Sequence, residues 1–198
     1  MTKPKVFVII YTTYHHMAER VKAGLEKAGV EATIYQVAET LPADVLAKMG
    51  APPKPNVPVI TAADLEKADG FVFGFPTRYG MIPAQFKAFW DSTGQLWAKG
   101  ALVGKMAATF TSTATLGGGQ ETTHLTFISQ LVHHGIVYVP LGYTNQQMFN
   151  IEEVHGGSPY GAGCIAGGDG SRQPSELELS VAEHQGSHFG KTISQYKK

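Results

Sequence analysis

Short apolar segments recur along the chain, and longer segments in which the apolar positions follow a helical period separate them. Short apolar runs bounded by turn residues are typical of strands in the interior of a sheet. We therefore expect five strands, at residues 5–11, 31–37, 70–75, 105–111 and 136–141.

The segments between these strands predict helices at residues 17–29, 62–67, 83–93, 122–134 and 174–197. Pro83 is expected at the first position of its helix, Thr61 and Asp64 are expected to cap theirs, and Gly135 follows the end of another. Strands that alternate with helices predict an α/β fold with a doubly wound five-stranded parallel sheet and helices on both faces.

Two segments interrupt the alternation. Residues 38–60 contain prolines at 42, 52, 53, 55 and 58, which predict a loop with at most a short helix at 43–49. Residues 142–174 are rich in glycine and show no periodicity, so we expect a long insertion after strand five. Segments of this length are usually functional.

Composition narrows the class of protein. The 198 residues are 43% hydrophobic and 16% charged, which predicts a single globular domain spanning 1–198 with a buried sheet. No apolar run approaches the roughly 20 residues of a membrane span, and no separate signal core precedes the first strand. Cys164 is the only cysteine and cannot form an internal disulfide, so a cytoplasmic location is expected.

The formal net charge is zero. A nucleic-acid-binding protein needs a basic surface, and soluble electron carriers often use a strong field to steer docking. The charge balance therefore argues against both classes.

The loop after the first strand has the properties of a phosphate site. Residues 12–16 lead directly into a helix, whose first amides can hold an anion. The loop offers two hydroxyls but no Lys or Arg, and it lacks both the triphosphate-binding lysine and the dinucleotide motif G-x-G-x-x-G. A monophosphate remains, and flavin mononucleotide (FMN) is the candidate, with its phosphate on residues 12–17.

The loop after strand three combines Pro76, Thr77, Arg78, Tyr79 and Gly80. Backbone donors and an aromatic side chain could surround a flat ring with polar edges. A simple turn with a surface arginine explains the same residues equally well.

The loop after strand four, residues 112–121, places a cluster of hydroxyls beside Gly117, Gly118 and Gly119. Consecutive glycines expose backbone amides and permit close approach. A flexible connector would not need the hydroxyls, so ligand binding is favoured. Ligands of doubly wound sheets bind beyond the carboxyl ends of the strands, so these three loops predict one three-sided site.

Several motifs resemble those of a known family, the WrbA-type flavodoxin-like NAD(P)H:quinone oxidoreductases. They lie at similar spacing along essentially the whole chain, at residues 74–80, 91–97, 117–121, 133–135, 156–162 and 168–174. The resemblance implies a flavodoxin-like fold, non-covalent FMN, NADH or NADPH as donor, and a homotetramer in which segments such as 142–174 complete neighbouring sites.

The resemblance also implies roles for individual residues. Tyr14 and Trp97 are expected at the quinone and nicotinamide site, and His133 is expected as the catalytic residue beside the flavin. The family usually has Gly at the position of His15. The full set expected to bind the cofactor is Thr12, Thr13, Tyr14, His15, His16, Met17, Pro76, Thr77, Arg78, Tyr79, Gly80, Ser112, Thr113, Ala114, Thr115, Leu116, Gly117, Gly118 and His133; no metal ligand is expected.

The predicted reaction is two-electron reduction of quinones to hydroquinones, by ping-pong hydride transfer from NAD(P)H through FMN. Three alternatives stay open: an electron-carrier flavodoxin, a flavin-binding regulatory protein, and an NAD(P)H-dependent FMN or azo-dye reductase. The sequence does not distinguish NADH from NADPH, because no cluster of arginines for a 2′-phosphate is evident.

Other features are expected to be structural. Residues 161–166 match G-x-G-x-x-A but lack the flanking strand and helix that give this motif its meaning. His184 and His188 lie four residues apart without a third metal ligand, and Cys164 has no identifiable base. Phe86, Phe89 and Trp90 have the spacing of a buried helix face.

Overall fold

The computed structural model describes residues 2–11, 15–51 and 53–196, and in these ranges the strands form one parallel sheet. The order is β2-β1-β3-β4-β5, and a further strand, β6, also pairs with β4. The expected five-stranded doubly wound sheet is therefore confirmed, with one strand added. The strands are β1 (Lys5–Ile10), β2 (Glu31–Gln36), β3 (Gly70–Pro76), β4 (Met106–Thr113), β5 (Val137–Tyr138) and β6 (Gly163–Ile165).

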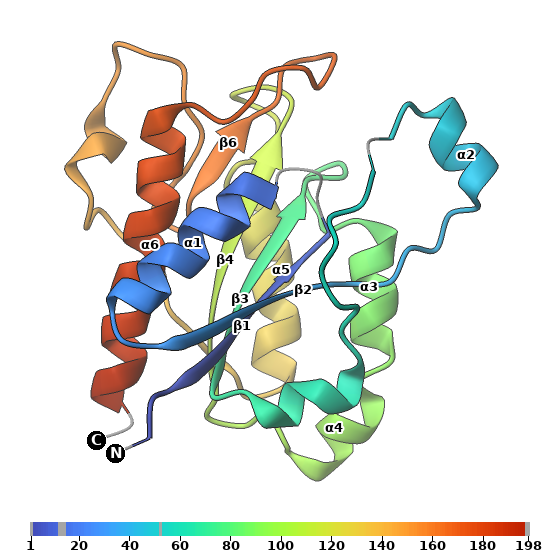
Figure 1. Ribbon diagram of the computed structural model, residues 1–198, viewed down its shortest axis with the longest axis vertical. Helices are drawn as coiled ribbons and strands as arrows, with labels where there is room; N and C mark the ends of the chain where they lie inside the picture. Colours follow the sequence, from blue (N-terminus) through green and yellow to red (C-terminus); the bar gives the residue numbers. More distant parts are fainter. Residues whose placement is uncertain (1, 12–14, 52, 197–198) are drawn as a thin grey trace.

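Helices cover both faces of the sheet, as Figure 1 shows: α1 and α6 lie on one face, and α3 and α5 on the other. The short α2 sits on an arm that extends away from the sheet. The helices are α1 (His15–Lys27), α2 (Ala43–Lys48), α3 (Ala84–Asp91), α4 (Gly94–Lys99), α5 (Thr122–His133) and α6 (Glu176–Tyr196), with 3₁₀ turns η1 (Ala62–Lys67) and η2 (Gln146–Phe149).

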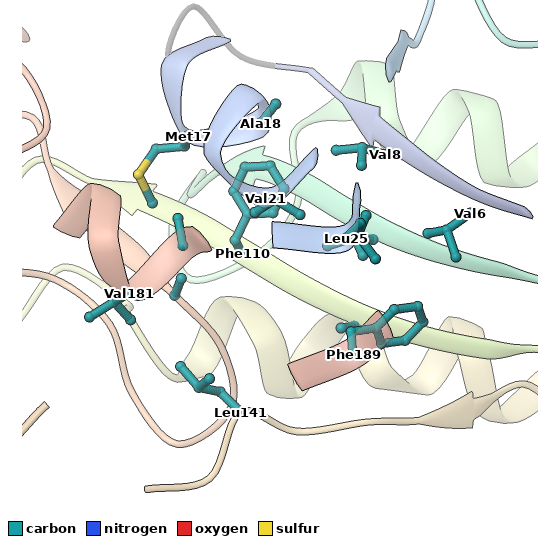
Figure 2. Close-up of a cluster of buried hydrophobic side chains, with 14 of the residues drawn as sticks. Val6, Val8, Met17, Ala18, Val21, Leu25, Phe110, Leu141, Val181 and Phe189 are labelled. Atoms are coloured by element: carbon teal, nitrogen blue, oxygen red, sulfur yellow. The ribbon is translucent and has the colours of Figure 1, made fainter. Parts of the chain in front are cut away.

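The side chains of β1 point alternately into two hydrophobic cores, one on each face of the sheet. Val6 and Val8 pack with α1 and α6, as Figure 2 shows, whereas Phe7 and Ile9 face the opposite layer. Side chains on a strand point to alternate faces, so one strand serves both layers. The second core is aromatic and includes Phe86, Phe89 and Trp90, which confirms that these three residues are buried.

The helices α1 and α6 cross with almost no space between their backbones. A methyl group at Gly24 would overlap the carbonyl oxygen of Glu183, and one at Gly186 would overlap that of Val21. Both positions therefore need glycine, because any side chain would push the two helices apart.

Several expected elements differ from those observed. Residues 62–67 form a 3₁₀ turn instead of an α-helix: Thr61 and Asp64 cap each other as expected, but the chain is already extended at Ala68. Pro83 precedes α3 as its N-cap residue with an extended backbone (φ −69°, ψ 157°), so it is not the first helical residue. The end of the expected helix is followed by a separate short helix, α4, which was not predicted.

The fifth position of the sheet is composite. β5 pairs with Met106 and Ala107 only, and β6 pairs with residues 111–113 of β4. The insertion therefore begins before the fifth strand position is filled, and β6 completes it. The prediction of a complete fifth strand at 136–141, followed by the insertion, is wrong in this respect. Pro140 has no N–H with which to continue the ladder, and Gly161 lets the returning chain lie against the carbonyl of Thr109.

A buried ion pair holds the end of the insertion. Glu178 of α6 is fully buried, and its Oε2 lies 2.9 Å from Nη1 of Arg172. The same carboxylate accepts hydrogen bonds from the amides of Gly156 (2.9 Å), Ile165 (2.9 Å) and Ser175 (2.8 Å). A buried charge is tolerated when its oxygens are paired in this way, so Glu178 fixes the insertion to α6.

Candidate functional site

The carboxyl ends of the central strands bring the predicted loops to one edge of the sheet. Ile10 is level with Gly74, and Pro76 is level with Ser112. The loops that follow β3 and β4 consequently begin side by side, at the top of Figure 1, where α1 also begins. Thr12, Thr13 and Tyr14 lie outside the described residues.

The start of α1 carries three of the predicted residues. His15 opens the helix, and its Nδ1 is buried without a hydrogen-bond partner. His16 is exposed, and its Nδ1 lies 3.1 Å from Oε2 of Glu19. Met17 is buried in the core, so its side chain serves packing, and only its backbone is available to a ligand at the helix start.

The loop after β3 is a tight turn around Thr77. Its hydroxyl accepts hydrogen bonds from the amide of Gly80 (3.1 Å) and from the hydroxyl of Thr123 (2.8 Å). The backbones of Arg78 and Met81 pair in an isolated antiparallel β-bridge. Tyr79 is held at φ 54° and is fully exposed. A bulky residue in the left-handed region is strained, and such strain is typical of ligand-binding sites.

The loop after β4 presents backbone amides. Thr115 O accepts hydrogen bonds from Thr113 Oγ1 (2.7 Å) and from the amide of Gly118 (3.2 Å), which defines a turn. Within the described ranges, the amides of Leu116 and Gly117 donate no hydrogen bond. Among the described residues, a Cβ atom at Gly117 would meet nothing within 4 Å, so the space beside this glycine is open.

These two loops are fixed to each other. The amide of Thr77 donates to Ser112 O (2.8 Å), and the hydroxyl of Thr126 on α5 donates to Gly80 O (3.0 Å). A Cβ atom at Gly119 would lie 3.2 Å from Thr77 Oγ1, so this glycine lets the loops approach. Pro76, Thr77, Arg78, Tyr79 and Gly80 therefore lie together with residues 112–118.

This edge fits a flavin in its chemistry. Open amides suit the polar edge of the ring, and an exposed aromatic side chain suits its flat face. The start of α1 suits a phosphate, because its first amides lack intrahelical acceptors. In the described part of the chain, no group of three His, Cys, Asp or Glu residues is placed to hold a metal ion.

A charged cluster beside β1 was not predicted from the sequence. Tyr11 donates to Glu39 (2.9 Å), and Lys54 lies 2.8 Å from Glu39 and 3.9 Å from the centre of the Tyr11 ring. Burial and the Glu39 hydrogen bond raise the pKa of Tyr11 to about 12. Burial opposes ionisation of Glu39, but hydrogen bonds, first that from Lys54, lower its pKa to about 2. The cluster ties the arm at 38–60 to the end of β1.

His133 and Trp97 lie at the other end of the molecule. His133 is the last residue of α5, whose first turn contacts the loop after β3 through Thr123 and Thr77. At 1.5 Å per residue this helix spans about 18 Å. Trp97 is 61% exposed on α4, at the bottom of Figure 1, where Thr93 contacts His134. One chain therefore does not bring these two residues to the loops.

The structure also locates the other features that the sequence predicts to be structural: residues 161–166, Cys164, and the pair His184 and His188. Residues 161–166 contain β6, and the next helix, α6, begins only at Glu176. Gly161 and Gly163 make room for Thr109 and Gln120. Cys164 is buried, and burial raises the pKa of its thiol to about 12. The rings of His184 and His188 are parallel with centroids 6.4 Å apart, and His184 contacts Thr144.

A family model described as NADPH-dependent FMN reductase matches residues 12–149 of this chain. The chain belongs to this family. Its description names a flavin and a reduced nicotinamide, which agrees with the donor set at the sheet edge.

Individual relatives are similar over nearly the whole chain. NAD(P)H quinone oxidoreductase PST2 of Candida albicans is 54% identical over 200 residues, covering 100% of both chains. Quinone-oxidoreductase QR2 of Triphysaria versicolor is 58% identical over 190 residues, covering 93% of each. The resemblance to quinone oxidoreductases is thereby confirmed as a family relationship.

Solved structures give the same fold. The WrbA-like flavodoxin from Agrobacterium tumefaciens superposes with a TM-score of 0.66 at 23% identity, covering 98% of this chain and 99% of that one. The flavodoxin-like architecture is therefore confirmed. None of the helices in the described ranges combines the length and the hydrophobicity needed to cross a bilayer.

Proposed function

We propose that residues 1–198 act as one cytoplasmic FMN-binding domain with NAD(P)H:quinone oxidoreductase activity. The observation that carries the proposal is the convergence of the start of α1, the exposed Tyr79 and the open amides of Leu116 and Gly117 at one sheet edge. Family membership and the quinone oxidoreductase names of the relatives support the choice of reaction.

The residues divide into a phosphate part and a ring part. In the proposal, Thr12–Met17 hold the phosphate with hydroxyls and backbone amides, and His15 and His16 border it. Pro76–Gly80 and Ser112–Gly118 surround the ring. FMN held there without a covalent link would supply the redox chemistry by which two electrons pass from NADH or NADPH to a quinone in a ping-pong sequence.

The chain's own groups contribute binding and electrostatics. The open amides of Leu116 and Gly117 donate hydrogen bonds that stabilise negative charge at the ring edge, as preorganised donors do in other active sites. Tyr79 offers an aromatic surface for flat substrates, on which nicotinamide and quinone stack in turn. Its fixed left-handed backbone holds this surface away from the core.

The central test is a Gly117→Glu variant. Its side chain enters open space, so the fold is expected to persist, while the added carboxylate opposes an anionic ligand. The dissociation constant for FMN, measured by fluorescence titration, is expected to rise by ~10²-fold. Ala47→Glu, at an exposed position of α2 on the arm that extends away from the sheet, is the control and should bind FMN as the parent protein does.

Turnover then distinguishes the alternatives. Rapid NAD(P)H oxidation that requires added benzoquinone supports the proposed reaction. A bound flavin that NADPH reduces but benzoquinone does not reoxidise would instead indicate a carrier or a regulatory protein. A parent protein that neither binds FMN nor gains activity with it would overturn the proposal.

We also propose that the chain acts as a homotetramer in which a neighbouring copy supplies His133 and Trp97. Both are exposed at the edge opposite the flavin loops, beside the exposed apolar residues Val103 and Val132. In the proposal, His133 donates a hydrogen bond at the neighbour's ring edge, and Trp97 closes its substrate slot. The exposed Tyr143 and Phe149 of the insertion offer further apolar contact area.

Mixing two inactive variants tests the shared site. His133→Ala is expected to lower turnover by about 10²-fold. Gly117→Glu is assayed at an FMN concentration well below its raised dissociation constant, so that its own flavin sites stay largely empty. Because a shared site pairs the loops of one copy with His133 of another, co-expression is expected to restore about a quarter of the parent activity. If the mixture is no more active than the separate variants, or if light scattering shows a monomer, the shared site is wrong.

A further inference from the structure

Gln120 joins three segments at the edge of the flavin loops. Its Nε2 donates to Thr113 Oγ1 (2.8 Å) and to Cys164 O (3.2 Å), and its Oε1 accepts from the amide of Gly157 (2.7 Å). These partners belong to the end of β4, to β6 and to the insertion. Gln120 directly follows Gly117–Gly119, so its hydrogen bonds can influence the conformation of the glycine-rich loop.

The surroundings are shaped to receive this amide. A Cβ atom at Gly163 would overlap Gln120 Oε1, so the strand leaves out a side chain where the amide sits. Gly157 adopts φ 101°, a conformation that favours glycine and that accompanies donation of its N–H to Gln120. Two backbone positions are thus adapted to one side chain.

The contact reaches the open amides through Thr113. The Thr113 hydroxyl accepts from Gln120 and donates to Thr115 O, and Thr115 O also closes the turn to Gly118. The orientation of Leu116 and Gly117, which lie inside this turn, therefore depends on the Gln120 amide. Linked hydrogen bonds of this kind reinforce one another.

The other end of the contact is anchored. Gly157 follows Gly156, whose amide donates to the buried carboxylate of Glu178. Glu178 in turn pairs with Arg172. Gln120 is thus hydrogen-bonded to a part of the insertion that Glu178 and Arg172 fix in place, and this bond can hold the 113–118 loop in one conformation.

We propose that Gln120 is a positioning residue for the flavin: it braces the 113–118 loop against the insertion and so sets the affinity and the midpoint potential of the bound flavin. The inference rests on the proposed function, since it concerns the same site. It adds that Gln120, which does not line the ring site itself, changes the affinity and potential of the flavin through its hydrogen bond to Thr113 and the turn at Thr115.

The test compares Gln120→Met and Gln120→Glu with Gln130→Met, a control on the outer part of α5. Gln120→Met keeps the length but removes all three hydrogen bonds. Gln120→Glu keeps an acceptor for Gly157 but places an oxygen against Cys164 O. Both are expected to raise the FMN dissociation constant by about tenfold or more, because each lost hydrogen bond is worth up to about a tenfold change.

Redox titration gives a readout that a purely structural role would not move. The midpoint potential of the bound flavin is expected to shift in both Gln120 variants and to stay unchanged in Gln130→Met. Thr113→Val should cause a similar shift that does not add to that of Gln120→Met, because both act through one chain of bonds.

The outcomes separate the two proposals. If the parent protein and Gln130→Met bind FMN and the Gln120 variants match them in affinity and potential, the positioning role is wrong while the proposed function stands. If the parent protein fails to bind FMN, both are overturned. If Gln120→Met does not fold, Gln120→Glu decides by the same two measurements.

Discussion

Replacing Glu178 by Ala is expected to lower the free energy of unfolding by about 3–5 kcal/mol, as is typical when one partner of a buried ion pair is removed. The carboxylate is fully buried and accepts from three backbone amides besides Arg172. The variant would leave these donors and the guanidinium without their acceptor. Urea denaturation of the apo protein at neutral pH measures the loss.

Two further variants show where the effect comes from. Glu178→Gln keeps the shape but turns one acceptor into a donor that faces other donors, so it should also be destabilising. Glu26→Gln, in the exposed Lys22–Glu26 pair on α1, is the control and should cost under about 1 kcal/mol. Equal losses for Glu178→Ala and Glu26→Gln would contradict the anchoring role of Glu178.

Replacing Gly186 by Ala is expected to cost about 3 kcal/mol or more of unfolding free energy, because one methyl group must separate α1 from α6. The added carbon would overlap Val21 O, and backbone atoms cannot rotate away as a flexible side chain can. Gly24→Ala, on the facing helix, is expected to act similarly. Thermal unfolding monitored by circular dichroism detects both losses.

Gly94 provides a matched control for these helix variants. It lies in α4 and has nothing within 4 Å of the position that a methyl group would take. Gly94→Ala should therefore be neutral or raise stability by about 0.5–1 kcal/mol, as expected for glycine replaced in a helix. A loss at Gly94 as large as that at Gly186 would show that the close crossing is not the cause.

Much of the fold could be predicted because it depends on local patterns. The apolar run at 5–11 and the amphipathic segment after it gave the first strand and helix, since burial on both faces of a sheet dictates them. The loops after β3 and β4 were located correctly, because the carboxyl ends of parallel strands meet at one edge.

The remaining features depend on contacts between distant segments. β6 is a strand of three residues within a glycine-rich segment, so no periodicity can reveal it. The position of His133 follows from the direction of α5, whereas its expected place beside the flavin came only from the family resemblance. Gln120 had a signal, a glutamine next to a glycine run, but its role becomes visible only through Gly157 and Cys164.

The divided fifth position of the sheet has a consequence for folding. Pairing of β6 with β4 closes a loop that contains all the residues between Thr113 and Gly163. Pairing of β5 with β4 closes a shorter loop, between Ala107 and Val137. Longer loops cost more entropy to close, and non-local pairings slow folding. We therefore expect the upper half of β4 to gain its second neighbour last, so that the glycine-rich loop takes its final form only in the closing stage of folding.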